Sequence, residues 1–196
     1  MKYPTAVLAL LVICGAFGVD AATGPKSPQP EQSTHADETQ FINPAIEDYG
    51  KVVNLPDAAH QPRAGSQIVV DVTKGGDRDQ LNTAIEKVCR YVNIYAGAGK
   101  ETAKVEIAVV LHDDATLAAL SDNAYAARFG TEGNPNLDCL SAQKGASVKV
   151  CVCGQSLINK GEKPSEVSPQ ADVAVSALTA LVNLQADGYS YVPMLK

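Results

Sequence analysis

A thiol at the point where a strand turns into a helix is the feature of this sequence best suited to chemistry. The stretch 148–157 begins as an apolar, β-branched run, typical of a short buried strand, and stops at Gly154, after which Gln155 and Ser156 can open a helix. In parallel α/β sheets, reactive groups collect outside the carboxyl ends of the strands, where a helix N-terminus offers free N–H groups. Because that setting favours thiolate, the reactive form, Cys153 is the leading candidate for a functional residue.

Two further side chains are candidates to act with this thiol. Cys151 shares a strand face with Cys153, so it is either a resolving or ligand thiol or a core residue. A disulfide between the two would be strained, since same-face Cα atoms of a strand lie about 6–7 Å apart. His112 follows an apolar stretch and should reach the same edge of the sheet. Its imidazole is either a base for the thiol or a group hydrogen-bonded within a loop.

The residues around these candidates have more than one interpretation. The three residues after Cys153 can donate hydrogen bonds to an anion or a perthiolate, or Ser156 only caps a turn. Asp113 and Asp114 are expected to cap the following helix rather than to act as an acid/base pair. The glycine-rich segment 74–77 lacks the spacing of a phosphate or dinucleotide loop, so we expect no cofactor.

Cys89 and Cys139 have apolar neighbours at helical spacing, and we predict that both pack in the core. Small disulfide-built folds are richer in cysteine than this chain, although one bridge is not excluded. A zinc site is not expected, because no second pair of ligands occurs at a standard spacing.

Stretches with strand and helix patterns alternate after residue 65. Strands are predicted at 67–73, 105–111, 148–153, 171–175 and 189–193, and helices at 77–96, 116–120, 124–129, 137–144 and 176–186. Asp77 or Asp79 is expected to cap the first helix, and Pro193 suits an edge strand. The alternation predicts an α/β fold: a three-layer α/β/α sandwich with a mostly parallel, about five-stranded sheet.

The N-terminal part has a different composition. We divide the 196 residues into a secretory signal peptide at 1–21, a flexible tether at 22–44 and an α/β domain at 45–196, with residues 41–65 as an ordered extension. The apolar run of the signal peptide is too short to span a bilayer comfortably, so we expect no membrane span and a periplasmic or secreted protein. A net charge of −6 without basic clusters argues against nucleic acid as a partner.

Six short motifs in family order make the chain resemble the DsrE/DsrF-like family, in its exported branch, over roughly residues 65 to 194. They are residues 70–75, 109–112, 134–137, 152–157, 175–178 and 188–189. The resemblance implies a three-layer sandwich that assembles into homo-oligomers such as trimers or hexamers, and it makes Cys153 the position that carries sulfur as a persulfide. The chain departs from the family pattern at Cys151, an additional thiol, and at Asp113, where glycine is expected.

These observations favour a periplasmic sulfur-handling protein that exchanges sulfane sulfur with a donor or acceptor protein through Cys153. One alternative is a thiol–disulfide oxidoreductase that uses Cys151 and Cys153. Another is a non-enzymatic oligomer that binds a small ligand or a soft metal such as Cu(I), since thiolates prefer soft metals.

Overall fold

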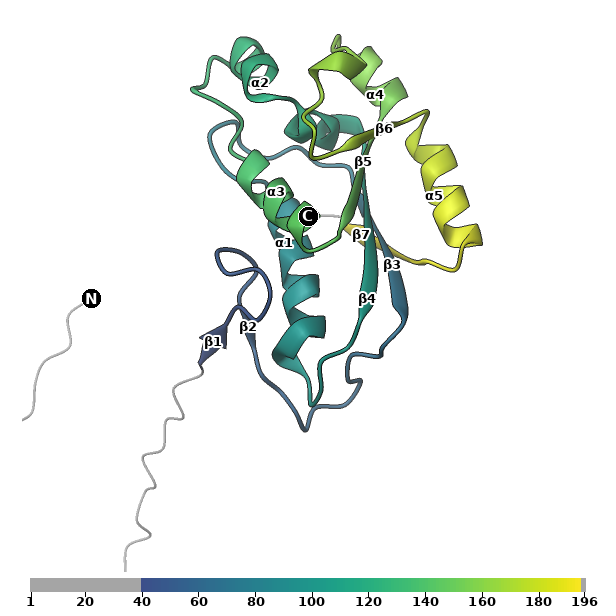
Figure 1. Ribbon diagram of the computed structural model, residues 1–196. Coiled ribbons are helices and arrows are strands. Elements are labelled where there is room, and N and C mark those ends of the chain that lie inside the picture. The colour runs from purple at the N-terminus through teal and green to yellow at the C-terminus, as the bar shows by residue number, and fades with distance from the viewer. Residues whose placement is uncertain (1–39, 195–196) are drawn as a thin grey trace, which may run out of the picture. The chain divides into compact units, whose positions relative to one another are not determined.

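A parallel five-stranded sheet in the order β6-β5-β4-β3-β7 is the centre of the fold (Figure 1). The computed structural model describes residues 40–194. The strands are β3 (Ser66–Val72), β4 (Val105–Leu111), β5 (Lys149–Cys153), β6 (Asp172–Ala174) and β7 (Ser190–Met194). All four strand pairings are parallel, which confirms the predicted sheet. Pro193 lies in β7, an edge strand, where a missing N–H is tolerated.

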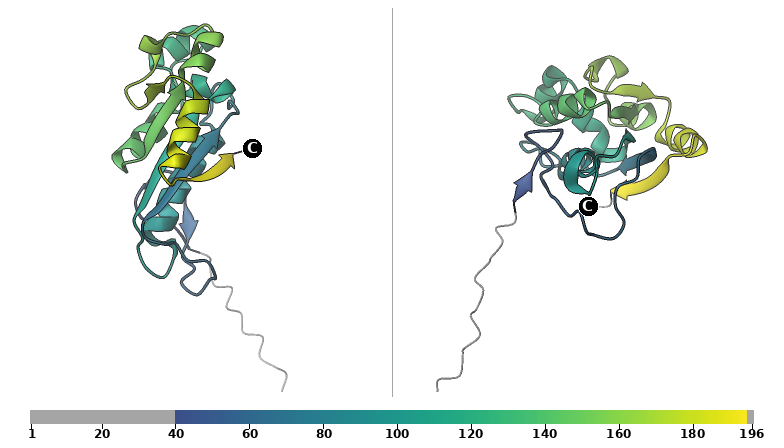
Figure 2. Two further views of the ribbon diagram at one scale, coloured as in Figure 1. Left: turned by 90° about the vertical axis from the view of Figure 1, so that its right-hand side faces the viewer. Right: turned by 60° about the horizontal axis from the view of Figure 1, so that its bottom comes forward.

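Helices cover both faces of the sheet, which confirms the α/β sandwich. In Figure 1, α1 (Thr83–Asn93) and α3 (Leu137–Gly145) lie on one side of the strands and α5 (Ala177–Ala186) on the other. Figure 2 shows α5 lying across the strands. The short helices α2 (Asp122–Phe129) and α4 (Gly154–Asn159) and the 3₁₀ segments Asp113–Ala119 and Pro164–Glu166 gather around the carboxyl ends of the strands.

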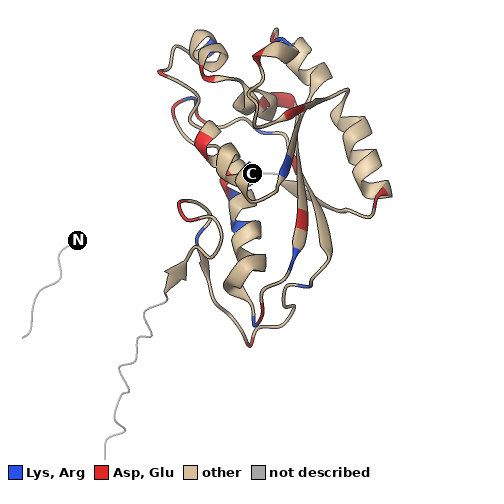
Figure 3. Cartoon of the chain, viewed as in Figure 1, with Lys and Arg blue, Asp and Glu red and all other residues tan. Residues whose placement is uncertain are grey.

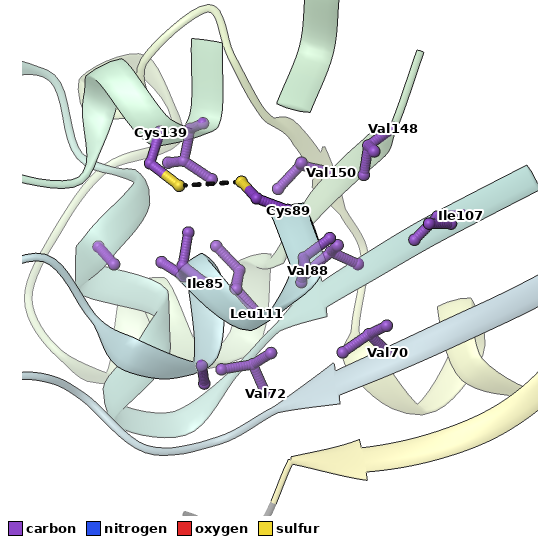
Figure 4. Close-up of a cluster of buried hydrophobic side chains, with 14 of the residues drawn as sticks. Val70, Val72, Ile85, Val88, Cys89, Ile107, Leu111, Cys139, Val148 and Val150 are labelled. Carbon is purple, nitrogen blue, oxygen red and sulfur yellow. Dashed lines mark hydrogen bonds between the residues drawn. The ribbon is translucent and has the colours of Figure 1, made fainter. Parts of the chain in front are cut away.

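Alternating strand residues divide the core between these two layers. Val70, Val72 and Leu111 face α1 and α3 in the larger cluster, which Figure 4 shows. Val69 and Val110 face the opposite way and pack with Cys153 beneath α5. Complete burial of side chains of this size stabilises the fold by about 1.5–3 kcal/mol each. The sheet is therefore buried on both faces, which explains its nearly continuous apolar strands.

The first helix differs from the prediction at both ends. Asn82 caps it with a hydrogen bond from the Ala84 N–H, so the helix begins at Thr83, and the expected caps Asp77 and Asp79 are wrong. At its other end, a π-helical segment, Ile94–Ala98, continues it. The Asn82 N–H is itself held by the side chain of Asn136, a contact 54 residues away that no local pattern reveals.

The N-terminal extension is ordered and rests on α1. A short antiparallel pair joins β1 (Phe41–Ile42), which falls within the span assigned to the tether, to β2 (Val52–Val53). The buried Asn93 side chain fixes the loop between them, because it accepts from two backbone N–H groups and donates to three carbonyls of residues 45–50. The predicted signal peptide at 1–21 lies outside the described residues, as does most of the predicted tether. Between residues 40 and 194, no helix has the length and apolarity that crossing a membrane requires.

Candidate functional site

Cys153 is the last residue of β5 and the N-cap of α4, as the strand-to-helix pattern predicts. Its sulfur accepts a hydrogen bond from the Ser156 N–H, with an N–S distance of 3.4 Å. The residue is only 4% exposed and packs with Val69, Val110 and Ala177 beneath α5. The sulfur is thus a buried hydrogen-bond acceptor at the carboxyl edge of the sheet.

The hydrogen bonds around this sulfur favour its charged form. Burial alone would raise the pKa of Cys153, but donors from the Ser156 side chain and from the backbone N–H groups of Ala177, Ser156 and Gln155 outweigh it. The net effect lowers the pKa of Cys153 below that of an ordinary thiol. A thiol that accepts hydrogen bonds forms the nucleophilic thiolate more readily than a thiol surrounded only by aliphatic groups.

One layer of the chain, residues 174–178 at the start of α5, separates this sulfur from solvent; we call this segment the cover. Ala177, in the first turn of α5, is 4% exposed, whereas Val175 and Leu178 on the outer side are 76% and 77% exposed. Gly154 permits the close approach of this cover, since a Cβ at position 154 would lie 2.9 Å from the carbonyl oxygen of Ala174. The most pronounced surface cavities in the described part lie elsewhere, one beside Phe41 and another beside Lys74.

Cys151 lies on the same face but in a different electrostatic environment. Burial, followed by Asp172 and Cys153, raises its pKa to about 11. The strand stays regular through this region, because Cys151 pairs with Asp172 and Cys153 with Ala174 in the same parallel register. That regularity keeps the Cα atoms of the two cysteines about 6–7 Å apart, a spacing at which a disulfide is strained. All four described cysteines are free thiols.

His112 reaches the edge of the sheet beside Cys153, because the pairing of Leu111 with Val152 aligns the two following residues. Its Nε2 is hydrogen-bonded to Asp71 Oδ1 at 2.6 Å. The other Asp71 oxygen accepts the Tyr191 hydroxyl at 2.6 Å, which raises the pKa of Tyr191. The ring is therefore held by a carboxylate, while the role of His112 as a base for the thiol stays a prediction.

Asp71 and Tyr191 are site neighbours that the sequence analysis missed. Asp71 is 7% exposed on β3, an inner strand, and Tyr191 belongs to the adjacent edge strand β7. The one available signal is a carboxylate within an otherwise apolar strand, since a buried charge requires partners.

The two aspartates after His112 do not act as helix caps. No side chain caps the 3₁₀ segment that starts at Asp113, so that expectation is wrong; Lys160 pairs with Asp113 at 3.7 Å and, more closely, with Asp114. Asp113 has a φ of +53°, a left-handed conformation that favours glycine. This explains why glycine is expected here. The Asp113 N–H donates to the Ser156 hydroxyl, which ties this turn to the start of α4.

Gln155 is exposed, and Gly154 and Ser156 are partly buried. The Ser156 N–H donates to the Cys153 sulfur, while a role of this segment in binding an anion or a perthiolate stays a prediction. Among residues 40–194, no three His, Cys, Asp or Glu side chains come together in a way that could hold a metal ion.

The opposite pKa shifts of Cys153 and Cys151 predict how the two thiols titrate. In a Cys89→Ala/Cys139→Ala background, thiolate absorbance should appear in two steps, one below the ordinary thiol pKa from Cys153 and one near pH 11 from Cys151. The lower step should disappear in Cys153→Ser and remain in Cys151→Ser. Ultraviolet absorbance suits this measurement because it needs no reagent to reach the sulfur. A first step that survives in Cys153→Ser would contradict the assignment.

Taken together, the parallel sheet and Cys153 define an α/β protein with a hydrogen-bonded thiol at the carboxyl edge of the sheet. The chain belongs to the DsrE/DsrF-like family, whose family model matches residues 67–194. That family is generally linked to sulfur relay.

A solved structure with a similar fold is a protein of unknown function from Methanobacterium thermoautotrophicum, 17% identical, with a TM-score of 0.49. The match covers 66% of this chain and 99% of that one. A search of curated proteins finds no significant match.

Proposed function

We propose that this chain is an exported, periplasmic sulfur carrier that holds sulfane sulfur as a persulfide on Cys153. The observation that carries the proposal is the position of the Cys153 sulfur at the N-cap of α4, where it accepts the Ser156 N–H, and the lowered pKa of this thiol agrees with that geometry. Membership of a family linked to sulfur relay supports it. The apolar stretch at 1–21 supports export.

The chemistry needs neither an oxidant nor a reductant. The Cys153 thiolate attacks the outer sulfur of a donor persulfide, the donor S–S bond breaks, and the donor leaves as a thiolate. In the reverse direction, an acceptor thiolate attacks the outer sulfur and Cys153 leaves. The donors on the Cys153 sulfur assist both steps, since they stabilise its thiolate as nucleophile and as leaving group.

Burial limits access to the thiol. Because Cys153 is 4% exposed, loading requires a small movement of the segments that supply the donors, residues 154–156 and 175–177. The outer side of this cover is only one helix thick. Local movement of these segments would therefore expose the sulfur without unfolding the sheet.

The direct test is incubation of the folded protein with a small-molecule persulfide donor, followed by intact mass spectrometry and peptide mapping. The proposal expects a gain of one sulfur atom, mapped to Cys153 and removed by a thiol acceptor. An unchanged mass after incubation, with Cys153 shown to react with a small alkylating reagent, would refute it.

The alternatives receive less support. A Cys151/Cys153 oxidoreductase needs a second reactive thiol, whereas the pKa of Cys151 is raised to about 11 and the strand between the two is regular. A soft-metal site would have to rely on these two thiols alone among the described His, Cys, Asp and Glu side chains.

We also propose that a second copy of the chain covers α5. Val175, Leu178 and Val182 form an exposed apolar surface, at 76%, 77% and 64% exposure. No charged residue lies in α5, and Figure 3 shows red only at its C-terminal end, where Asp187 follows the helix. Because the chain carries a net charge of −6, two copies repel elsewhere and can approach most easily through an uncharged face.

Leu178→Asp should therefore weaken self-association by about 30-fold or more, the loss expected for a central apolar contact. Light scattering during size-exclusion chromatography measures the change as a shift towards monomer. Asn183→Asp adds the same charge at an exposed polar position of α5 and serves as the control. A wild-type protein that is monomeric at all concentrations would contradict this part of the proposal.

A further inference from the structure

Two cysteines unrelated to the candidate site lie in contact on the other face of the sheet. The sulfurs of Cys89 in α1 and Cys139 in α3 are 3.3 Å apart, and a dashed line marks their contact in Figure 4. Both residues are 0% exposed, which confirms the prediction that they pack in the core. Side chains of the larger core cluster surround them, whereas Cys153 belongs to the cluster beneath α5.

We propose that Cys89 and Cys139 form a disulfide that joins α1 to α3 when the chain matures in an oxidising compartment. The two sulfurs have to approach from 3.3 Å to about 2.05 Å, a change that small side-chain rotations can supply. The bond would close a loop of 50 residues between the two helices that cover this face of the sheet.

The polar contact beside the pair suits sulfur as an acceptor. Gln143 is fully buried, and its Nε2 lies 3.5 Å from Cys89 Sγ and 3.7 Å from Cys139 Sγ, besides donating to the Ile85 carbonyl. Disulfide sulfurs accept and never donate, so this amide can serve both of them. Two thiols would instead leave two buried S–H donors, only one of which the sulfur–sulfur contact uses.

The bond forms by thiol–disulfide exchange with a donor disulfide. The Cys89 thiolate attacks a donor disulfide, and one donor thiolate leaves. Cys139 then loses its proton and attacks the Cys89 sulfur, which releases the second donor thiolate. Two protein thiols and one donor disulfide thus give one protein disulfide and two donor thiols.

Because both sulfurs are completely buried, this exchange has to take place during folding. With both sulfurs at 0% exposure, a donor disulfide reaches them only while α3 is not yet packed on α1. Once formed, the bond is shielded from small reductants. The persulfide chemistry proposed for Cys153 does not depend on it, because the two sites lie on opposite faces of the sheet.

The test uses wild-type chain recovered from the periplasm of a bacterial host, whose disulfide-donating catalysts supply the oxidant. The protein is denatured, alkylated without reductant and mapped by mass spectrometry. The expected result is a Cys89–Cys139 linked peptide pair that lacks two hydrogen atoms, with Cys151 and Cys153 alkylated. The same link should persist in Cys151→Ser/Cys153→Ser. Alkylation of both Cys89 and Cys139 in the exported wild-type protein would overturn the proposal.

A thermal measurement adds a second readout. Reduction of the denatured protein followed by refolding under reductant should lower the melting temperature by roughly 10 °C, given the loop that the bond closes. Cys89→Ala/Cys139→Ala should melt at one temperature in the presence and absence of reductant. A wild-type melting temperature that reductive refolding leaves unchanged would also count against the bond.

Discussion

Cys153→Ser is expected to abolish sulfur loading at Cys153 and to leave only slow loading elsewhere. At pH 7 a thiol with a pKa of about 11, such as Cys151, is roughly 0.01% thiolate, whereas a thiol below pKa 9.0 is at least about 1%. The weaker intrinsic nucleophilicity of the more acidic thiol offsets about tenfold of that hundredfold difference. Loading of Cys153→Ser should therefore be at least about tenfold slower than that of the wild type, measured as the rate of mass gain after addition of a persulfide donor.

Cys151→Ser is the matched control, since it removes the neighbouring thiol and keeps the donors on Cys153. Its loading rate should stay within about twofold of wild type, and the added sulfur should map to Cys153. If the function depended on a dithiol pair, both variants would lose activity equally. Equal loss, or wild-type loading in Cys153→Ser, would be incompatible with a single carrier thiol.

Much of the fold was predictable because residues close together in the sequence determine where most strands and helices form. The strands β3, β4 and β5 are apolar runs buried on both faces, so periodicity and turn residues locate their ends within about one residue. The start of α1 was missed for the opposite reason. The Asn82 N–H donates a hydrogen bond to the side-chain oxygen of Asn136, and this long-range contact outweighs the local capping tendency of Asp77 and Asp79.

The same distinction applies to the site. Cys153 was recognisable because the strand, the glycine and the helix start are neighbours in sequence. Asp71 and Tyr191 meet only because β7 pairs beside β3, and 120 residues separate them. The contact between Cys89 and Cys139 likewise depends on how α3 packs against α1. Periodicity can place each residue on a buried face, but it cannot identify the residue that it touches there.

Gly154 is the position at which the packing of the fold and the chemistry of the thiol depend on one another. The β6–α5 connection passes so close to it that an added Cβ would lie 2.9 Å from Ala174 O and 3.5 Å from Val175 O. The same connection leads to Ala177, whose N–H is one of the donors to the Cys153 sulfur. A methyl group added at position 154 must therefore displace this connection and, with it, the Ala177 N–H.

Gly154→Ala should reduce the free energy of unfolding by about 1–3 kcal/mol, the usual cost of overpacking against a backbone that cannot easily yield. It should also raise the pKa of Cys153 back towards that of an ordinary thiol, because the Ala177 donor moves away while burial remains. Denaturant unfolding measures the first effect and thiolate absorbance the second.

Gly145→Ala is the matched control: a Cβ at exposed Gly145 meets nothing within 4 Å, so that substitution should be neutral or stabilising by up to about 1 kcal/mol. If Gly154→Ala destabilised the fold but left the titration of Cys153 unchanged, the donors from the α5 side would have no part in stabilising the thiolate. The proposed carrier chemistry would then depend on the α4 segment alone.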